Sequence, residues 1–187
     1  MKDKLAIFDL DGTLVDTCMA NYEAYKLAVE EVYGEWPVSF EKFRDEYYGR
    51  NYKDFLWETG ITDPNILSEI HGRKSDVYEQ ILKRHGRANT FLLDVIRGIQ
   101  DNYNIAIVTT AARKNSQKVI DLFLKDIEID YVVTAEDVER LKPDTEGIKK
   151  AIEHFKCGHK DTVYFDDGDE AVEAAKRLGI TAYLVCL

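Results

Sequence analysis

The chain has 187 residues, of which 45% are hydrophobic and 32% charged, and its 35 acidic residues outnumber its 25 basic ones. This composition and length are typical of one globular domain with an insertion, large enough to fold without disulfides or structural metals. The acidic balance argues against a nucleic-acid partner. We expect neither a membrane span nor a signal peptide, because no apolar run approaches the ~20 residues that cross a bilayer and acidic residues occur early.

Five short apolar runs predict the strands of one buried sheet. In chain order they are Leu5–Phe8, Ile105–Val108, the weaker Tyr131–Val133, Val163–Phe165 and Ala182–Val185. Because the runs are continuous rather than alternating, they fit a parallel sheet covered on both faces. Helical spacing lies between the later runs, and strands that alternate with helices predict a doubly wound α/β core.

The segment from Asp16 to His85 interrupts this alternation. It has helical spacing without a convincing strand, and it holds 11 of the 21 aromatic residues between Tyr22 and Trp57. We expect residues 16–85 to form an inserted helical subdomain, and residues 1–15 and 86–187 to form the core. The aromatic residues would make the core of this insertion. An alternative is that a few of them line a substrate pocket, with Tyr48, Tyr52 and Trp57 as candidates.

Three scattered cysteines, Cys18, Cys157 and Cys186, have no metal-binding spacing. An odd number of such residues indicates reduced thiols in a cytoplasmic protein, and we expect them to be mostly buried. The four histidines have no ligand spacing either, so we interpret them as structural or surface residues: His71, His85, His154 and His159.

The first apolar run ends in FDLDGTLVDT, where Asp9 and Asp11 stand two residues apart. Along an extended chain their carboxylates point to the same side, and Gly12 permits a sharp turn. Open α/β sheets bind ligands at the carboxyl ends of their strands, where these acids lie. Within this apolar context the pair indicates a functional site rather than ordinary capping residues.

This string resembles the first motif of the haloacid dehalogenase superfamily, whose phosphohydrolases use an aspartate nucleophile. The remaining family motifs also occur in order. They are a threonine after the next core strand, a lysine before a proline and an acidic pair after a later strand, represented here by Thr109, Lys142 and Asp166–Asp167. The resemblance implies a Rossmann-like core with an inserted helical cap.

Four carboxylates at one sheet edge would repel one another unless a cation lay among them. Oxygen ligands suit a hard ion, and Mg²⁺ is the best match. The resemblance implies that Asp9, the backbone carbonyl of Asp11 and Asp167 hold the ion. It leaves open whether Asp166 is a direct ligand or lies behind one.

The resemblance also implies a role for each catalytic residue. Asp9 attacks phosphorus and forms an aspartyl phosphate, while Asp11 protonates the leaving group and then activates water. Thr109 donates to a phosphoryl oxygen, and Lys142 neutralises another and restrains Asp9. Thr110 is a candidate substrate-binding residue. The expected reaction is the Mg²⁺-dependent hydrolysis of a small phosphomonoester.

Details of the motifs separate the branches of the family. Asp11 argues against carbon–halogen hydrolysis, since the dehalogenases proper lack a carboxylate there. The FDDG motif is similar to that of β-phosphoglucomutase and of the related phosphoglycolate-phosphatase-like branch. A histidine of the mutase cap corresponds to Asn21 here, so a phosphomutase is the second choice. A receiver-type phospho-acceptor module is the third, although that class has no such insertion after its first strand.

The inserted segment resembles the family's cap, in which basic residues reach the substrate. Arg50 and Lys74 are the chosen candidates, with Lys53 and Arg73 also considered. The alternative for each is a solvated charge on a helix. As a partner we expect a small phosphorylated metabolite, and we expect the chain to be a monomer or a weak homodimer.

Overall fold

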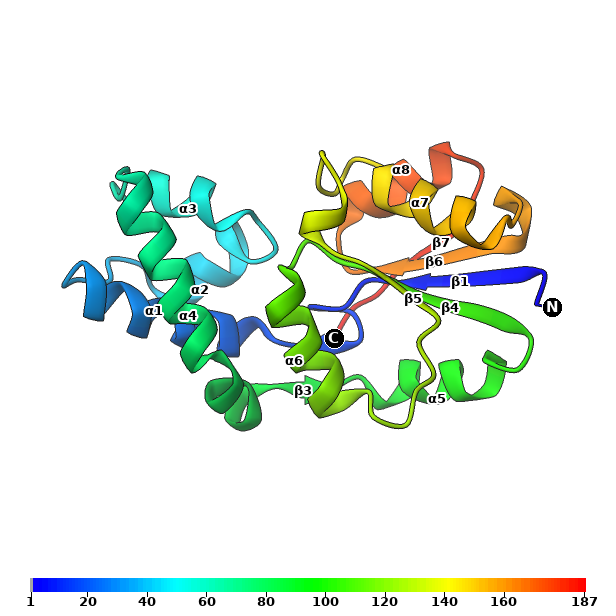
Figure 1. Cartoon of the computed structure of the whole chain (residues 1–187), viewed down its shortest axis with the longest axis horizontal. Coiled ribbons are helices and arrows are strands. Elements are labelled where there is room, and N and C mark those ends of the chain that lie inside the picture. The colour runs from blue at the N-terminus through cyan, green and yellow to red at the C-terminus, as the bar shows by residue number, and fades with distance from the viewer. Residues whose placement is uncertain (1) are drawn as a thin grey trace. The chain divides into compact units, whose positions relative to one another are not determined.

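The computed structural model describes residues 2–187, which divide into two compact units (Figure 1). The residues up to Asp16 together with Ala88–Leu187 form the sheet unit, and Thr17–Arg87 form the helical unit. The short strands β2 (Val15–Asp16) and β3 (Arg87–Ala88) lie where the chain passes from one unit to the other.

The sheet unit is built on one parallel sheet, which within the described residues has five strands in the order β5-β4-β1-β6-β7. Their bounds are β1 Lys4–Phe8, β4 Tyr103–Val108, β5 Tyr131–Val133, β6 Thr162–Asp166 and β7 Thr181–Leu184. β1 is central, and its Phe8 lies opposite Ile107 of β4 and Phe165 of β6. Leu5–Phe8 are all buried, as expected of a strand covered on both faces.

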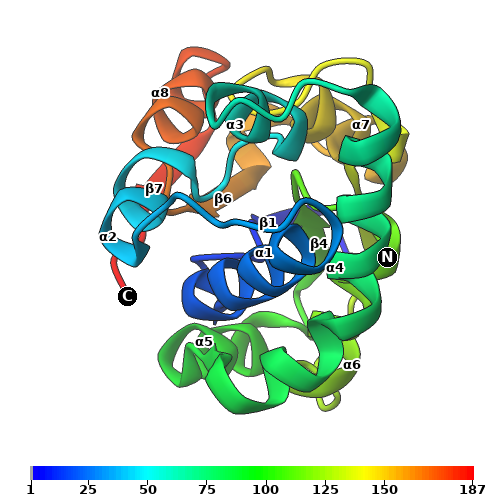
Figure 2. The same cartoon turned by 90° about the vertical axis from the view of Figure 1, so that its left-hand side faces the viewer.

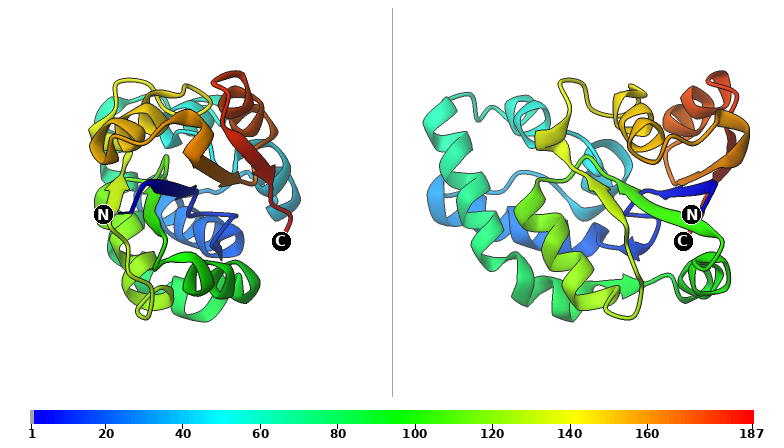
Figure 3. Two further views of the ribbon diagram at one scale, coloured as in Figure 1. Left: turned by 90° about the vertical axis from the view of Figure 1, so that its right-hand side faces the viewer. Right: turned by 45° about the vertical axis from the view of Figure 1, so that its right-hand side comes forward.

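Helices cover both faces of this sheet, as Figures 1 and 3 show. One pair covers one face and the other pair the opposite face: α5 Thr90–Ile99 with α6 Arg113–Phe123, and α7 Glu146–Phe155 with α8 Asp169–Arg177. On the second face Leu5 and Ile7 pack with Ile148 and Val172 in one apolar core. The short helices η2 and η3 span Ala135–Asp137 and His159–Asp161. The predicted doubly wound α/β fold is therefore confirmed.

β7 differs from the prediction. The sequence predicts a buried strand over Ala182–Val185, whereas the strand spans Thr181–Leu184 and only Ala182 of it is buried. The physical reason is its place at the edge of the sheet, where it pairs with β6 alone. An edge strand leaves apolar side chains partly in water, and Tyr183 and Leu184 are about half exposed.

The helical unit contains five consecutive helical segments. They are α1 Cys18–Val32, α2 Phe40–Lys42, the π-helix η1 Phe43–Tyr47, α3 Tyr52–Glu58 and α4 Pro64–His85. α1 and α4 pack against each other (Figure 2). The core of the unit is aromatic, with the ring of Phe43 in contact with those of Tyr22, Tyr25 and Phe55. The aromatic residues thus form a core of their own, as predicted.

The longest helix, α4, carries clear start and stop signals. Asp63 accepts a hydrogen bond from the N–H of Asn65 at 2.8 Å, and Pro64 occupies the first turn, where a missing N–H costs nothing. Gly86 ends the helix, and Lys83, Arg84 and His85 complement the negative end of its dipole.

The cysteines are more exposed than predicted. Cys18 and Cys157 are half-buried, and Cys186 is exposed because it follows the edge strand β7. The expectation of mostly buried thiols is wrong. Within residues 2–187, no helix combines the length and the apolar character needed to cross a membrane.

Candidate active site

Three candidate residues lie where neighbouring strands end. Asp9 follows β1, and its N–H donates to the carbonyl of Phe165 at 2.8 Å. Since Phe8 pairs with Ile107 and Phe165, Thr109 and Asp166 lie at the same edge of the sheet as Asp9. Asp9, Thr109 and Asp166 are all buried, so the charges of the two acids and the hydroxyl of the threonine need partners.

Lys142, in the segment before α7, connects two of these acids. Its ammonium donates to Oδ1 of Asp9 and, at 2.8 Å, to Oδ2 of Asp166. The side chain is 13% exposed, and those of the two acids are 5% and 4% exposed. Although burial opposes its charged form, the Asp9 carboxylate raises the pKa of Lys142 well above its usual value, with Tyr164 and Asp166 contributing. The lysine is therefore a fixed positive charge at the end of β1 and β6.

Both oxygens of Asp166 accept hydrogen bonds from the protein. The N–H of Gly168 donates to Oδ1 at 2.8 Å, while Oδ2 accepts from Lys142 and from the hydroxyl of Tyr164. The sequence alone does not mark Tyr164 as a site residue. The available signal is its position on β6 two residues before Asp166, which puts both side chains on one face of the strand.

Asp167 stands next to the turn that follows β1. The hydroxyl of Thr13, which is fully buried, donates to Oδ1 of Asp167 at 3.2 Å. Gly12 has a φ of +92°, and its Cα faces the same carboxylate. Thr13 lies within the first motif, but the sequence alone indicates no role for it. Its place directly after the Asp-Gly turn is the signal that it helps to orient the acidic pair.

Asp9, Asp166 and Asp167 bring carboxylate oxygens within 4.8 Å of one another. Among residues 2–187 this is the acidic group that could hold a metal ion, and the carboxylate of Asp11 is outside it. Asp11 is half-buried and its backbone forms a bridge with Val15. The structure therefore brings together three of the four predicted carboxylates.

The electrostatics of this group fit a divalent cation. Burial raises the pKa of Asp9 to about 8; Asp166 and Asp167 add to the rise and Lys142 opposes it. Partial desolvation, and then the charge of Asp166, raises the pKa of Asp167. Three ionised carboxylates carry three negative charges and Lys142 supplies one positive charge, so two negative charges remain. Oxygen ligands suit Mg²⁺. The donor set thus fits the expected ion.

Thr109 shapes the backbone after β4. Its hydroxyl accepts from the N–H of Ala111 at 3.1 Å, and its own N–H donates to the carbonyl of Val133 at 3.0 Å. Thr110 follows and is half-buried. The two neighbouring strands β4 and β5 therefore hold this turn in place at the same edge as Asp9.

Two candidate basic residues of the helical unit have different surroundings. Lys74 is 3% exposed, with Nζ 3.7 Å from the ring centroid of Tyr78 and 5.1 Å from that of Tyr25. The alternative of a solvated charge is thus wrong for Lys74, because it lies on the inner face of α4. Arg50 is exposed and ion-paired with Glu58, as a surface charge would be.

The other two basic residues considered are also on the surface of the helical unit. Arg73 forms an ion pair with Glu31, while the ammonium of Lys53 lies 5.9 Å from the ring centroid of Tyr52. Neither environment resembles the aromatic enclosure of Lys74. Arg73 therefore offers a matched surface control for experiments on the other basic residues.

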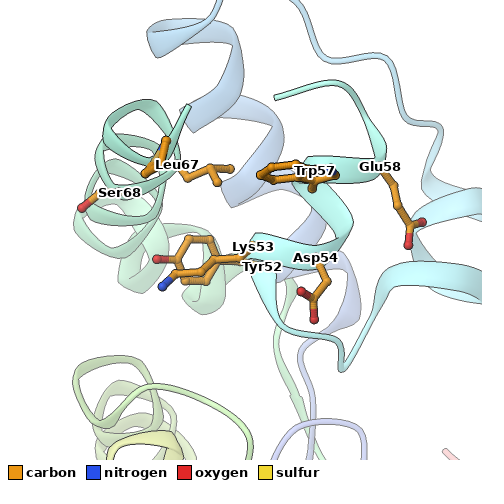
Figure 4. A pocket seen from close by; sticks show the side chains of 8 residues that line it. Tyr52, Lys53, Asp54, Trp57, Glu58, Leu67 and Ser68 are labelled. Carbon is orange, nitrogen blue, oxygen red and sulfur yellow. The ribbon is translucent and has the colours of Figure 1, made fainter. Parts of the chain in front are cut away.

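A pocket of about 660 Å³ lies in the helical unit beside α3 and the start of α4 (Figure 4). Tyr52 and Trp57 line it, together with Leu67 and Pro64, and Trp57 is 59% exposed. Tyr48, the third aromatic candidate, instead shares a hydrogen bond of 2.9 Å with Thr17. Two of the three aromatic candidates thus line a pocket, although most aromatic rings of the unit belong to its core.

The histidines contact other parts of the structure. His71 stacks on Tyr52 at 4.1 Å between ring centroids, and His154 stacks on Tyr131 at 4.0 Å. Nδ1 of His159 lies 2.7 Å from the carbonyl oxygen of Leu178. These contacts agree with the structural interpretation of the three residues.

Comparison with known proteins identifies the family. Residues 6–185 match the family described as haloacid dehalogenase-like hydrolase. The chain belongs to this family. The match includes all the motifs on which the predicted resemblance rests, from Asp9 to Asp167.

The relatives of this hydrolase extend over nearly its whole length. It is 24% identical to "Pyrophosphatase PpaX" of Halalkalibacterium halodurans over 99% of this chain and 84% of that protein. It is 26% identical to "Phosphorylated carbohydrates phosphatase" of Thermotoga maritima over 93% and 81%. The structure of CbbY from Rhodobacter sphaeroides in complex with phosphate has a TM-score of 0.86 at 18% identity, over 100% and 87%. The predictions of this fold and of an enzyme of this hydrolase family are confirmed.

Proposed function

We propose that the protein is a Mg²⁺-dependent phosphatase that hydrolyses a small phosphomonoester through a phosphoenzyme on Asp9. The observation that carries the proposal is the buried contact between Lys142 and Asp9 beside Asp167. Asp9 is held at the end of the central strand, where it contacts the ammonium of Lys142 and lies beside Asp167. A carboxylate in such a place is suited to attack phosphorus. The phosphatase names of the relatives support the same reaction class.

In the first step an oxygen of Asp9 attacks the phosphorus atom in line with the leaving group. The bond from Asp9 to phosphorus forms as the bond from phosphorus to the alkoxide oxygen breaks, and Asp11 gives its proton to that alkoxide. In the second step Asp11 takes a proton from water, whose oxygen attacks the phosphorus. Inorganic phosphate leaves, and the carboxylate of Asp9 is restored.

Two other residues stabilise the charge of the transferring group. Lys142 neutralises one phosphoryl oxygen while its hydrogen bond keeps Asp9 in place. Thr109 donates its hydroxyl hydrogen to another phosphoryl oxygen, and Thr110 lies next to it as a further binding residue. Fixed donors of this kind need no reorganisation during the reaction, so they favour the transition state.

Asp9, Asp167 and the backbone carbonyl of Asp11 would hold the Mg²⁺ ion. When bound, the ion supplies neutralising charge for the phosphate and for the carboxylates. The raised pKa of Asp9, about 8, supports this part of the proposal. A cation beside Asp9 favours its ionised form, which is the form that attacks phosphorus.

The helical unit is the proposed cap and the proposed source of specificity, with Arg50 and Lys74 as substrate-binding residues. A small phosphorylated metabolite is the proposed substrate of a monomer or weak homodimer in the cytoplasm. Pyrophosphate is the second candidate, because a relative carries that name. A phosphomutase is less well supported: the amide of Asn21 donates to Thr17 and Tyr78, and an amide cannot serve as an acid or base.

The test is phosphate release from a panel of sugar phosphates, other small phosphomonoesters and pyrophosphate, with Mg²⁺ and with EDTA. We expect at least one monoester to release phosphate with Mg²⁺ and none with EDTA, and Asp9→Asn to be inactive on every substrate. Turnover of pyrophosphate alone would favour the second candidate. Transfer of phosphate between positions of one sugar, without release, would favour the mutase.

A further inference from the structure

Tyr164 is a polar residue in the middle of an apolar core. It lies on β6 opposite Ile7 of the central strand, it is completely buried, and its ring packs in the core formed by residues such as Leu5 and Val172. A buried hydroxyl group is costly unless it has a hydrogen-bond partner. Its partner here is Oδ2 of Asp166, at the end of the same strand.

The hydroxyl of Tyr164 shares this acceptor with the ammonium of Lys142, which lies 2.8 Å from the same oxygen. The other oxygen of Asp166 accepts from the N–H of Gly168. With donors on both oxygens, the carboxylate cannot rotate without losing hydrogen bonds in a buried environment. The place of the ammonium, which also donates to Oδ1 of Asp9, therefore depends on the orientation of Asp166.

We propose that Tyr164 is a positioning residue: its hydroxyl orients Asp166, which holds Lys142 against the nucleophile Asp9. This inference rests on the proposed function, in which Asp9 attacks phosphorus. Tyr164 would act on the rate only through the position of Asp9, because small displacements of an attacking group reduce rates strongly.

The first variant for the test is Tyr164→Phe, which keeps the ring in the core and removes only the hydroxyl. Its matched control is Tyr183→Phe on the neighbouring strand β7, where the side chain is about half exposed and stacks on Phe165. With p-nitrophenyl phosphate and Mg²⁺, we expect Tyr164→Phe to lower kcat by about tenfold with KM changed by less than about twofold. The control should match the wild type, and thermal melting should show both variants folded.

A double-mutant cycle separates positioning from a general loss of stability. If Tyr164 acts through Asp166 and Lys142, the loss caused by Tyr164→Phe should nearly vanish when Lys142→Met is already present. Single-turnover measurements with excess enzyme keep this slow background measurable. The same fold loss in both backgrounds would overturn the inference, as would a Tyr164→Phe enzyme as fast as the Tyr183→Phe control.

A readout without turnover tells failure of this inference from failure of the proposed function. Beryllofluoride imitates a phosphoryl group on a carboxylate, and its capture by Asp9 with Mg²⁺ can be followed by ¹⁹F NMR. We expect the wild type to capture it, Tyr164→Phe to need about tenfold more, and Asp9→Asn to show no signal. Capture unchanged in Tyr164→Phe would overturn the positioning role alone. If the wild type shows no capture of beryllofluoride and no turnover, the proposed function is overturned, and the inference with it.

Discussion

A Cβ atom on Gly12 would lie 2.2 Å from Oδ2 of Asp167, so the backbone of the first turn touches the carboxylate of the last motif. The φ of Gly12, +92°, is also one that residues with a side chain rarely adopt. Glycine is required at this position by both space and backbone conformation. The contact joins the first and the last motif at the candidate metal site.

Gly12→Ala should therefore abolish most of the activity. The new methyl group would push Asp167 away from the position in which it meets Asp9, and we expect phosphate release to fall by roughly 10²-fold or more. The control is Gly179→Ala in the same unit, where φ is +82° but nothing lies within 4 Å of the added atom. It should lower the melting temperature and leave kcat near the wild-type value. Equal losses of activity in the two variants would show that backbone strain alone explains the effect.

Substitutions of Asp9 and of Asp11 should affect the rate of phosphorylation differently when the leaving group of the ester is changed. Asp9→Asn removes the proposed nucleophile, so no ester should react and no phosphoenzyme should form. Asp11→Asn removes the proposed proton donor, a contribution of roughly 10²–10⁴-fold. An alkoxide needs that proton and a nitrophenolate hardly does, so phosphorylation should slow far more with an alkyl phosphate. The measurement is the pre-steady-state burst, and equal slowing of both esters would show that Asp11 is not the acid.

The metal requirement should distinguish neighbouring acids of the last motif. EDTA should abolish phosphate release and Mg²⁺ restore it. Asp167→Ala should raise the Mg²⁺ concentration for half-maximal activity steeply, because Asp167 belongs to the carboxylate cluster. Asp169→Ala, in the first turn of α8, should raise it only weakly. Calorimetric titration with Mg²⁺ gives the same comparison without substrate, and full turnover after exhaustive chelation would contradict the metal assignment.

The basic residues of the helical unit should affect large and small substrates differently. Arg50→Ala should raise KM for the best substrate of the panel more than for p-nitrophenyl phosphate, which offers little for a cap residue to contact. Lys74→Ala should do the same and also lower stability, because it empties a buried site between Tyr25 and Tyr78. Arg73→Ala, which breaks an exposed ion pair with Glu31, is the control and should change neither KM.

Asp137 should make stability depend on pH. Burial opposes its charge, but hydrogen bonds from the N–H and hydroxyl of Thr134 and the charge of Arg113 win and lower its pKa. Because the pKa of Asp137 is lower in the folded state, its ionised form stabilises the fold at pH values above about 4, its pKa in the unfolded state. This stabilisation is lost as the pH falls through its pKa in the folded state. Asp137→Ala should therefore cost about 1 kcal/mol at pH 7 and less below pH ~4. Urea unfolding at both pH values measures this, and a constant difference would contradict it.

The sequence predicts the sheet well because its strands are buried on both faces. Continuous apolar runs mark β1 and β4 to within two residues at each end. The same signal misleads at β7, since apolar character does not tell an edge strand from a central one. Whether a strand lies at the edge or in the middle of the sheet is decided by its pairing with segments far away in the chain.

The residues of the candidate site likewise fall into two groups, those that the sequence predicts and those that it does not. Residues with a motif, such as Asp9 and Lys142, could be predicted because the sequence around them resembles the motifs of the family. Tyr164 and Thr13 could not, because a tyrosine in an apolar strand and a threonine in a turn have common structural explanations. Their hydrogen bonds to Asp166 and Asp167 exist only once the strands are paired. The burial of Lys74 is likewise a product of helix packing that its own segment does not reveal.

The hydrogen bond from Lys142 to Asp9 joins positions 133 residues apart, and that from Thr13 to Asp167 spans 154. During synthesis Asp9 is therefore made well before Lys142, and Thr13 well before Asp167. The groups of the candidate site therefore meet only once β1 has paired with β4 and β6.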